Sequence, residues 1–145
     1  MLTDTQVVWR LFLAVILGGV IGFEREKHNK GMAGLRTHIL VSVGSALIML
    51  VSIHIFEIYA GRASVDPSRI AAGVVTGIGF LGAGTIIRSG ESVKGLTTAA
   101  SLWTVSGIGM AVGCGFYIAG WATAVIAFTT LYLLRKLPVE DEKPY

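Results

Sequence analysis

The residues best suited to chemistry lie in one short polar segment between two apolar runs. Glu24, Arg25 and Glu26 follow the first run, and Arg36 opens the second. Two carboxylates beside two guanidinium groups can pair with one another and fix the connection, or they can hold a hydrated cation or an anionic partner. Burial of these charges would be costly unless they were paired or functional. This segment is the first candidate site, and both interpretations stay open.

A row of hydroxyl groups forms the second candidate. At 100° per residue, Thr97, Ser101 and Thr104 fall within about 60° of one another on a helix, with Lys94 one turn earlier on the same side. The hydroxyls can bond back to carbonyls of their own helix, bind a neighbouring helix, or form a polar site beneath the cation.

Short connections force neighbouring helices together, so we expect the two candidates to converge at one end of the molecule. The predicted functional cluster consists of Glu24, Arg25, Glu26, Arg36, Thr97, Ser101 and Thr104. No catalytic residues are predicted.

Glycines mark two smooth faces in the apolar run at 69–87. Gly73, Gly77 and Gly84 lie within about 40° of each other, and Gly79 and Gly82 lie on roughly the opposite side. Small residues let helices approach closely in lipid, where no hydrophobic effect drives association. These five glycines are predicted to pack helices, which would make this run the packing centre.

The other ionisable residues point to structure more than to chemistry. We expect Arg10, inside the first apolar run, to extend outward to the membrane surface. His38 and His54 are about 24 Å apart along a helix, so they cannot share one metal ion. Cys114 has no histidine near it in the sequence. Neither an enzyme nor a resident cofactor is expected, and metal ligands stay unknown.

The composition indicates a membrane protein. The chain has 145 residues, of which 53% are hydrophobic and only 14% are charged, with 19 further glycines. This is too apolar for a soluble domain, and a single cysteine excludes a disulfide scaffold. The net charge of +3 comes from basic residues between apolar runs, without a basic tract, so nucleic acid is not an expected partner.

Five apolar runs predict an all-α, polytopic membrane protein with five transmembrane helices. The runs are 7–23, 35–60, 69–87, 96–112 and 116–134, and each is close to the length that crosses a bilayer. Asp66 or Ser68 can cap the third helix. The predicted organisation is a transmembrane domain over residues 1–137 and a short cytoplasmic tail over 138–145.

The distribution of basic residues predicts the orientation. Lys and Arg concentrate on the cytoplasmic side of short loops. Five spans place nine basic residues on one side and only Arg62 and Arg69 on the other, with Arg10 inside the first span. The N-terminus is therefore expected outside and the C-terminus inside.

Four sequence blocks together resemble the membrane domain of the MgtC/SapB family. They are GGVIGFERE at 18–26, AGLRTHILVSVGSAL at 33–47, DPSRIAAGVVTGIGFLGAGTIIRSG at 66–90 and GLTTAASLWTVSGIGMAVGCG at 95–115. The resemblance covers nearly the whole chain and implies a small bacterial inner-membrane protein linked to magnesium limitation, with some relatives acting in acid tolerance or virulence. The chain departs from the virulence-associated branch at Thr97 and Thr104, where that branch carries Asn and Cys, and it shows only about ten residues after the last span where that branch has a soluble domain.

Two functions remain open at this stage. The first is cation transport, with Mg²⁺ the candidate that the resemblance implies. Whether Mg²⁺ is a ligand or a signal stays open. Mg²⁺ is usually held through carboxylates and retained waters, and the chain offers Glu24, Glu26 and Asp66 only at the interfaces, so a pore would need an oligomer. The second is regulation of another membrane protein, such as the rotary ATP synthase that the resemblance suggests. Expected partners are the lipid bilayer, a second copy in a homo-oligomer, with a dimer favoured, and a membrane-protein partner.

Overall fold

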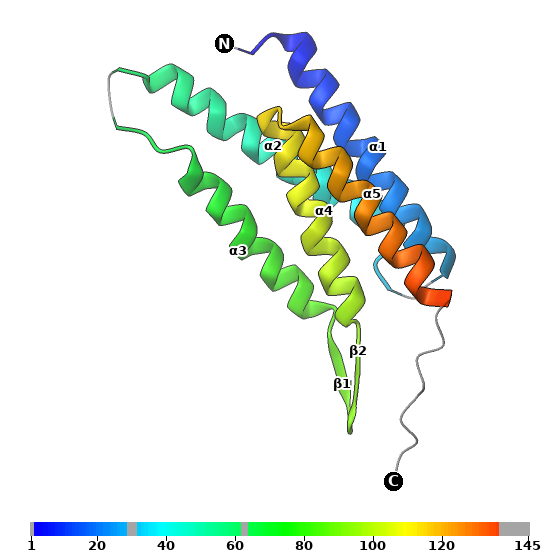
Figure 1. Ribbon diagram of the computed structural model, residues 1–145. Helices are drawn as coiled ribbons and strands as arrows, with labels where there is room; N and C mark the ends of the chain where they lie inside the picture. Colours follow the sequence, from blue (N-terminus) through cyan, green and yellow to red (C-terminus); the bar gives the residue numbers. More distant parts are fainter. Residues whose placement is uncertain (1, 29–31, 62–63, 137–145) are drawn as a thin grey trace.

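The computed structural model describes residues 2–28, 32–61 and 64–136, and it is built from helices (Figure 1). The helices are α1 (Asp4–His28), α2 (Leu35–Tyr59), α3 (Ser68–Gly84), α4 (Leu96–Cys114) and α5 (Tyr117–Leu133), followed by the short helix η1 (Leu134–Lys136). Strands β1 (Ile87–Ser89) and β2 (Ser92–Lys94) connect α3 to α4. The all-helical prediction is confirmed. The predicted tail at 138–145 lies outside the described residues.

Three helices are long and apolar enough to cross a membrane: α1, α2 and α4. The other two, α3 and α5, are apolar but have 17 residues each. Such a helix rises about 26 Å, at the short end of what spans a bilayer core. These helices indicate a membrane protein, whereas the number of five spans and the orientation stay predictions.

Thiol labelling in intact cells tests the orientation. With Cys114 replaced by serine, a cysteine at Ser64, before α3, is expected to react with a membrane-impermeant reagent. A cysteine at Ser89, in the exposed hairpin at the other end of α3, is expected to react only after permeabilisation. The reverse pattern would overturn the predicted orientation.

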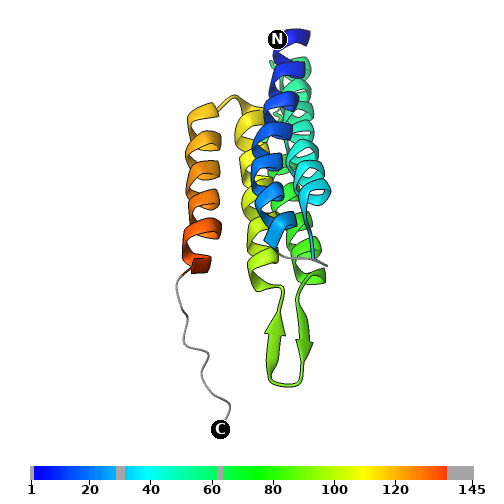
Figure 2. The same ribbon diagram turned by 90° about the vertical axis from the view of Figure 1, so that its right-hand side faces the viewer.

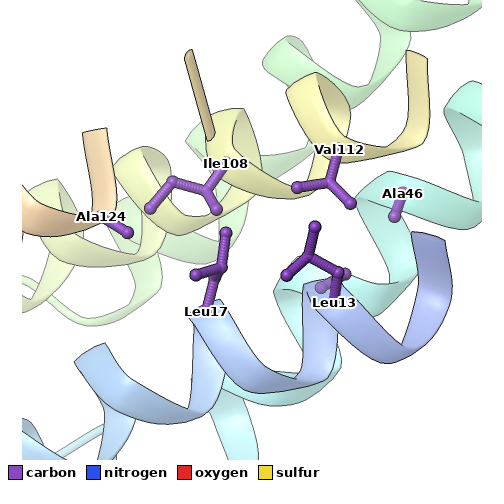
Figure 3. Close-up of a cluster of buried hydrophobic side chains, with 7 residues drawn as sticks. Leu13, Leu17, Ala46, Ile108, Val112 and Ala124 are labelled. Carbon is purple, nitrogen blue, oxygen red and sulfur yellow. The ribbon is translucent and has the colours of Figure 1, made fainter. Parts of the chain in front are cut away.

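The centre of the bundle is α4, which contacts each of the other four α-helices. Figure 3 shows its Ile108 and Val112 packed among side chains of α1, α2 and α5. By contrast, α3 contacts only α4 and α2 substantially and stands to one side of the bundle (Figure 1). The prediction that the run at 69–87 is the packing centre is therefore wrong.

Helix α2 packs closely against α1 and α4 because these two helices carry glycines at the contacts. A Cβ atom added at Gly109 would collide with the carbonyl oxygen of Ser42, and one at Gly113 would lie 2.6 Å from the carbonyl oxygen of Ala46. On α1, a Cβ atom at Gly18 would lie 2.7 Å from the Cβ atom of Ser42. The backbones therefore touch, as expected where small residues line a helix interface in lipid.

Four of the five glycines of α3 do not contact another helix of the described chain. A Cβ atom at Gly73, Gly77, Gly79 or Gly84 would meet nothing within 4 Å, and only Gly82 contacts a neighbour, at 3.6 Å from the Cβ atom of Ala99. Helical angles show which residues share a face, but not whether another helix covers it, and this was the source of the error. A helix-packing role for these four glycines, and the dimer, stay predictions.

The connection between α3 and α4 is a β-hairpin that the sequence analysis did not predict. Ile87 pairs with Lys94 in an antiparallel register, and the hairpin extends past the helix ends at the side where α5 ends (Figures 1 and 2). Gly95 joins β2 to α4 with φ of +91°, and a Cβ atom there would collide with the carbonyl oxygen of Thr85. Glycine is thus required at this position, and it directs Lys94 toward the start of α4.

The entry to α3 agrees with the predicted cap. The backbone N–H of Ser68 donates to the Asp66 carboxylate at 2.8 Å. Hydrogen bonds from the side chain and backbone of Ser68 lower the pKa of the Asp66 carboxyl below its ordinary value. The Ser52 hydroxyl donates to the carbonyl of Pro67 at 2.6 Å and so ties this entry to α2.

Candidate functional site

A polar cavity of about 780 Å³ opens at the end of the bundle from which the hairpin projects. It lies between the end of α1, strand β2, the first turn of α4 and the end of α5. We call it the hairpin-end pocket. Its polar lining residues are Glu24, Arg25, His28, Lys94, Thr97, Thr98, Thr130 and Arg135.

The Glu24 carboxylate is buried in the wall of this pocket, with 4% of its surface exposed. One oxygen, Oε1, lies 3.2 Å from Nδ1 of His28 and 3.3 Å from Nη1 of Arg135. The other, Oε2, has no hydrogen-bond partner among the described residues. A buried carboxylate is stable only when it is paired, so Arg135 compensates its charge, while Oε2 stays unpaired among the described residues.

Arg25 connects α1 to the first turn of α4. Its Nη2 donates to the Thr98 hydroxyl at 2.9 Å. The side chain is more than nine-tenths buried, and its Nε has no partner in the described part of the chain. A buried N–H group without an acceptor costs about 1–3 kcal/mol, more when it is charged. The pocket wall therefore carries one unsatisfied acceptor and one unsatisfied donor.

Behind the pocket, a buried histidine links α2 to α4. His38 Nδ1 lies 2.7 Å from the carbonyl of Gly34, which can only accept, so Nδ1 carries the proton. His38 Nε2 lies 3.0 Å from the hydroxyl oxygen of Ser101, and the Ser101 hydroxyl donates to the Thr98 carbonyl of its own helix at 2.8 Å. Further along the same two helices, the hydroxyls of Ser45 and Ser106 are 2.8 Å apart. His38 and Ser45 of α2 therefore contact α4, and this polar face packs the two helices together.

The structure brings together only part of the predicted cluster. Glu24, Arg25 and Thr97 line the hairpin-end pocket. Thr97, Ser101 and Thr104 together line a smaller cavity of about 270 Å³ between α4 and α5. The hydroxyl row therefore shares one face, as expected, although the Thr104 hydroxyl is bonded to the Ala100 carbonyl of its own helix at 2.9 Å.

Glu26 and Arg36 lie outside the pocket. The Glu26 carboxylate accepts the N–H of Leu35 at 3.0 Å and so fixes the start of α2. Arg36 is exposed and lines a separate apolar groove between α2 and α3. Residues two positions apart on a helix differ by about 200°, so Arg36 faces away from α4 when His38 faces it. The predicted placement of Arg36 in the cluster is wrong.

The outward extension predicted for Arg10 is also wrong. Arg10 is 9% exposed, and it donates from Nη1 to the Gly113 carbonyl at 2.8 Å and from Nε to the Tyr117 hydroxyl at 3.1 Å. Its guanidinium lies 5.8 Å from the centre of the Tyr117 ring. Carbonyls at the end of a helix lack partners within the helix, and at the end of α4 Arg10 supplies a donor.

The sequence analysis did not assign His28, His38, Thr98 and Arg135 to a site. Arg135 is 111 residues from Glu24, and no local pattern links the two. For Thr98, the helical angle was informative in principle, because it lies about 100° from Thr97 and so faces the bundle interior when Thr97 faces out.

The pocket offers no ready cage for a bare metal ion. No group of three or more His, Cys, Asp or Glu side chains that could hold a metal is found in residues 2–28, 32–61 and 64–136. The free oxygen of Glu24 can accept hydrogen bonds from the waters of a hydrated cation, and the surrounding cations can hold an anion.

These features define an all-helical membrane protein with a polar pocket at one end of its bundle. Residues 11–139 match the MgtC family, and the chain belongs to that family. No solved structure matches it.

Three relatives illustrate the similarity. The chain is 46% identical over 134 residues to the Escherichia coli K12 protein named "Putative magnesium transporter YhiD". It is 43% identical over 148 residues to Protein MgtC of Salmonella typhimurium and 38% identical over 136 residues to Protein SapB of Bacillus subtilis. The alignments cover 91%, 95% and 90% of this chain and 62%, 60% and 57% of the relatives. The chain thus spans about three fifths of their length.

Proposed function

We propose that this chain is a multi-pass protein of the bacterial inner membrane that takes part in magnesium transport and is not an enzyme. Family membership and the transporter name of the Escherichia coli relative support the magnesium role. The apolar helices α1, α2 and α4 support the membrane location.

The observation that carries the proposal is the free oxygen of Glu24. This carboxylate oxygen is buried in the wall of an open cavity and has no partner in the described ranges. Mg²⁺ dehydrates reluctantly and is usually bound through one or two carboxylates with several waters retained. A hydrated Mg²⁺ would therefore contact Glu24 through its waters. The nearby Arg25 and Arg135 disfavour tight binding, which suits an ion in passage better than a resident one.

Magnesium flux through the purified chain in liposomes tests this function. Liposomes that contain the protein and an enclosed Mg²⁺-sensitive dye are expected to take up Mg²⁺ several times faster than protein-free liposomes. Liposomes with the same amount of an unrelated helical membrane protein control for leakage. Uptake equal to that control would overturn the transport proposal.

A further inference from the structure

The first turn of α4 forms part of the hairpin-end pocket and lacks a side-chain cap. The helix has 19 residues, begins at Leu96 and has Gly95 as its N-cap residue, which makes no side-chain cap hydrogen bond. The first bond within this turn runs from the N–H of Ala99 to the carbonyl of Gly95, at 2.9 Å. The amides of Leu96 and Thr97, which precede this bond, have no carbonyl partner within the helix. A helix N-terminus carries partial positive charge and binds anions.

An independent feature of the same pocket also lacks an anionic partner. Arg25 is more than nine-tenths buried and lines the pocket, and its Nη2 holds the Thr98 hydroxyl of this first turn. Its Nε has no acceptor in the described parts of the chain. An oxyanion beside the first turn of α4 would supply an acceptor for both the amides and the guanidinium.

The charges around the pocket favour an anion as well. Three cationic side chains, Arg25, Lys94 and Arg135, line it together with the carboxylate of Glu24, which is the one acidic group among its described lining residues. Arg135 and His28 already contact that carboxylate. Lys94 is exposed on β2, directly before the helix start, so its ammonium group can turn toward a ligand.

From this geometry we infer that the hairpin-end pocket binds a phosphate group at the N-terminus of α4, held by Arg25, Lys94 and the hydroxyl of Thr97. A phosphate has several acceptor oxygens and a charge that matches the surplus of cations. Inorganic phosphate and the headgroup of an anionic phospholipid both carry this chemistry. The inference goes beyond the proposed function, because binding of phosphate does not require that magnesium crosses the membrane.

The experiment measures phosphate binding to the purified full chain in a neutral detergent. Inorganic phosphate is titrated into the protein at constant ionic strength, with chloride as the reference anion, and the midpoint of thermal unfolding and the heat of binding are recorded. Phosphate is expected to bind saturably and to raise the midpoint, since a ligand that binds only the folded state stabilises it. No saturable response to phosphate, together with no retained anionic lipid, would overturn the inference.

Variants locate the site. Lys94→Gln is expected to weaken phosphate binding about tenfold, because it removes one charge-assisted contact. Arg88→Gln is the matched control, because Arg88 lies exposed in the same hairpin and does not line the pocket. This variant should bind phosphate as tightly as the wild type. An equal loss of phosphate affinity in Lys94→Gln and Arg88→Gln would contradict the proposed position of the site. Arg25→Gln should abolish binding, and Lys94→Gln keeps the test valid if that buried variant does not fold.

A second arm identifies the source of the phosphate group. The chain is reconstituted in vesicles of phosphatidylcholine with or without phosphatidylglycerol, extracted gently and analysed by native mass spectrometry. Retained phosphatidylglycerol that Lys94→Gln releases indicates a lipid headgroup, whereas phosphate binding without retained lipid indicates the free ion. Both results support the site. Glu24→Gln should leave phosphate binding intact or strengthen it, which separates this inference from the magnesium role of Glu24.

Discussion

Replacing Gly109 by leucine is expected to disrupt the folded bundle. A Cβ atom at this position collides with the carbonyl oxygen of Ser42, so α2 and α4 would have to separate. Overpacking of a well-packed core costs about 1–3 kcal/mol and occasionally more. We expect a cost at the upper end of that range, because the obstacle is backbone and cannot change rotamer. Circular dichroism during heating in detergent, with gel filtration, measures the loss.

Gly77→Leu is the matched control for this prediction. It makes the same change on α3, where an added Cβ atom meets nothing within 4 Å. Leucine also has a higher helix propensity than glycine, so the midpoint of unfolding should stay the same or rise. Equal losses of stability in both variants would contradict the central position of α4. If Gly77→Leu keeps its helices but changes oligomer size, the open face of α3 is a contact with a second copy.

Glu24→Gln is expected to reduce magnesium uptake in liposomes at least about tenfold. The substitution keeps the size of the side chain and removes the charge that attracts a hydrated dication, and the loss of one charged contact corresponds to about this factor. Arg135 and His28 would lose their charged partner at Oε1. Initial rates of uptake at equal protein density, compared with wild type, measure the effect.

Glu91→Gln supplies the control for the loss of one negative charge. Glu91 is exposed in the hairpin turn and does not line the hairpin-end pocket, so this variant should transport at the wild-type rate. A stable, inserted Glu24→Gln protein with wild-type uptake would exclude Glu24 from the pathway.

Much of the helical structure could be predicted from the sequence because apolar runs and their polar ends are local signals. The second run, expected over 35–60, forms α2 at Leu35–Tyr59, and the break near Gly115 separates α4 from α5 as expected. The third helix was expected to continue to residue 87 but ends at Gly84, since the following apolar residues Ile86 and Ile87 lead into and begin the hairpin. Apolar side chains in a short exposed strand are difficult to distinguish from the last turn of an apolar helix.

The candidate site was predictable only in part, because sequence spacing gives faces and not neighbours. The association of Glu24 and Arg25 with Thr97 followed from short connections and orientation, and the pocket contains all three. The contacts of Arg135 with Glu24 and of Arg10 with Gly113 join residues more than a hundred positions apart. The periodicity of the sequence does not predict such contacts, because they depend on how α1, α4 and α5 pack.

The contact between Glu24 and Arg135 also has a consequence for the order of events during biosynthesis. Arg135 follows Glu24 by 111 positions in the chain. The ribosome adds about 5–20 residues per second, so Arg135 emerges roughly 6–22 seconds after Glu24. During that interval α1 carries a carboxylate whose later guanidinium partner does not yet exist, with His28 one turn away. The pairing is therefore completed only when η1, which follows α5, has been made, and a nascent chain halted before it would carry an incompletely neutralised first helix.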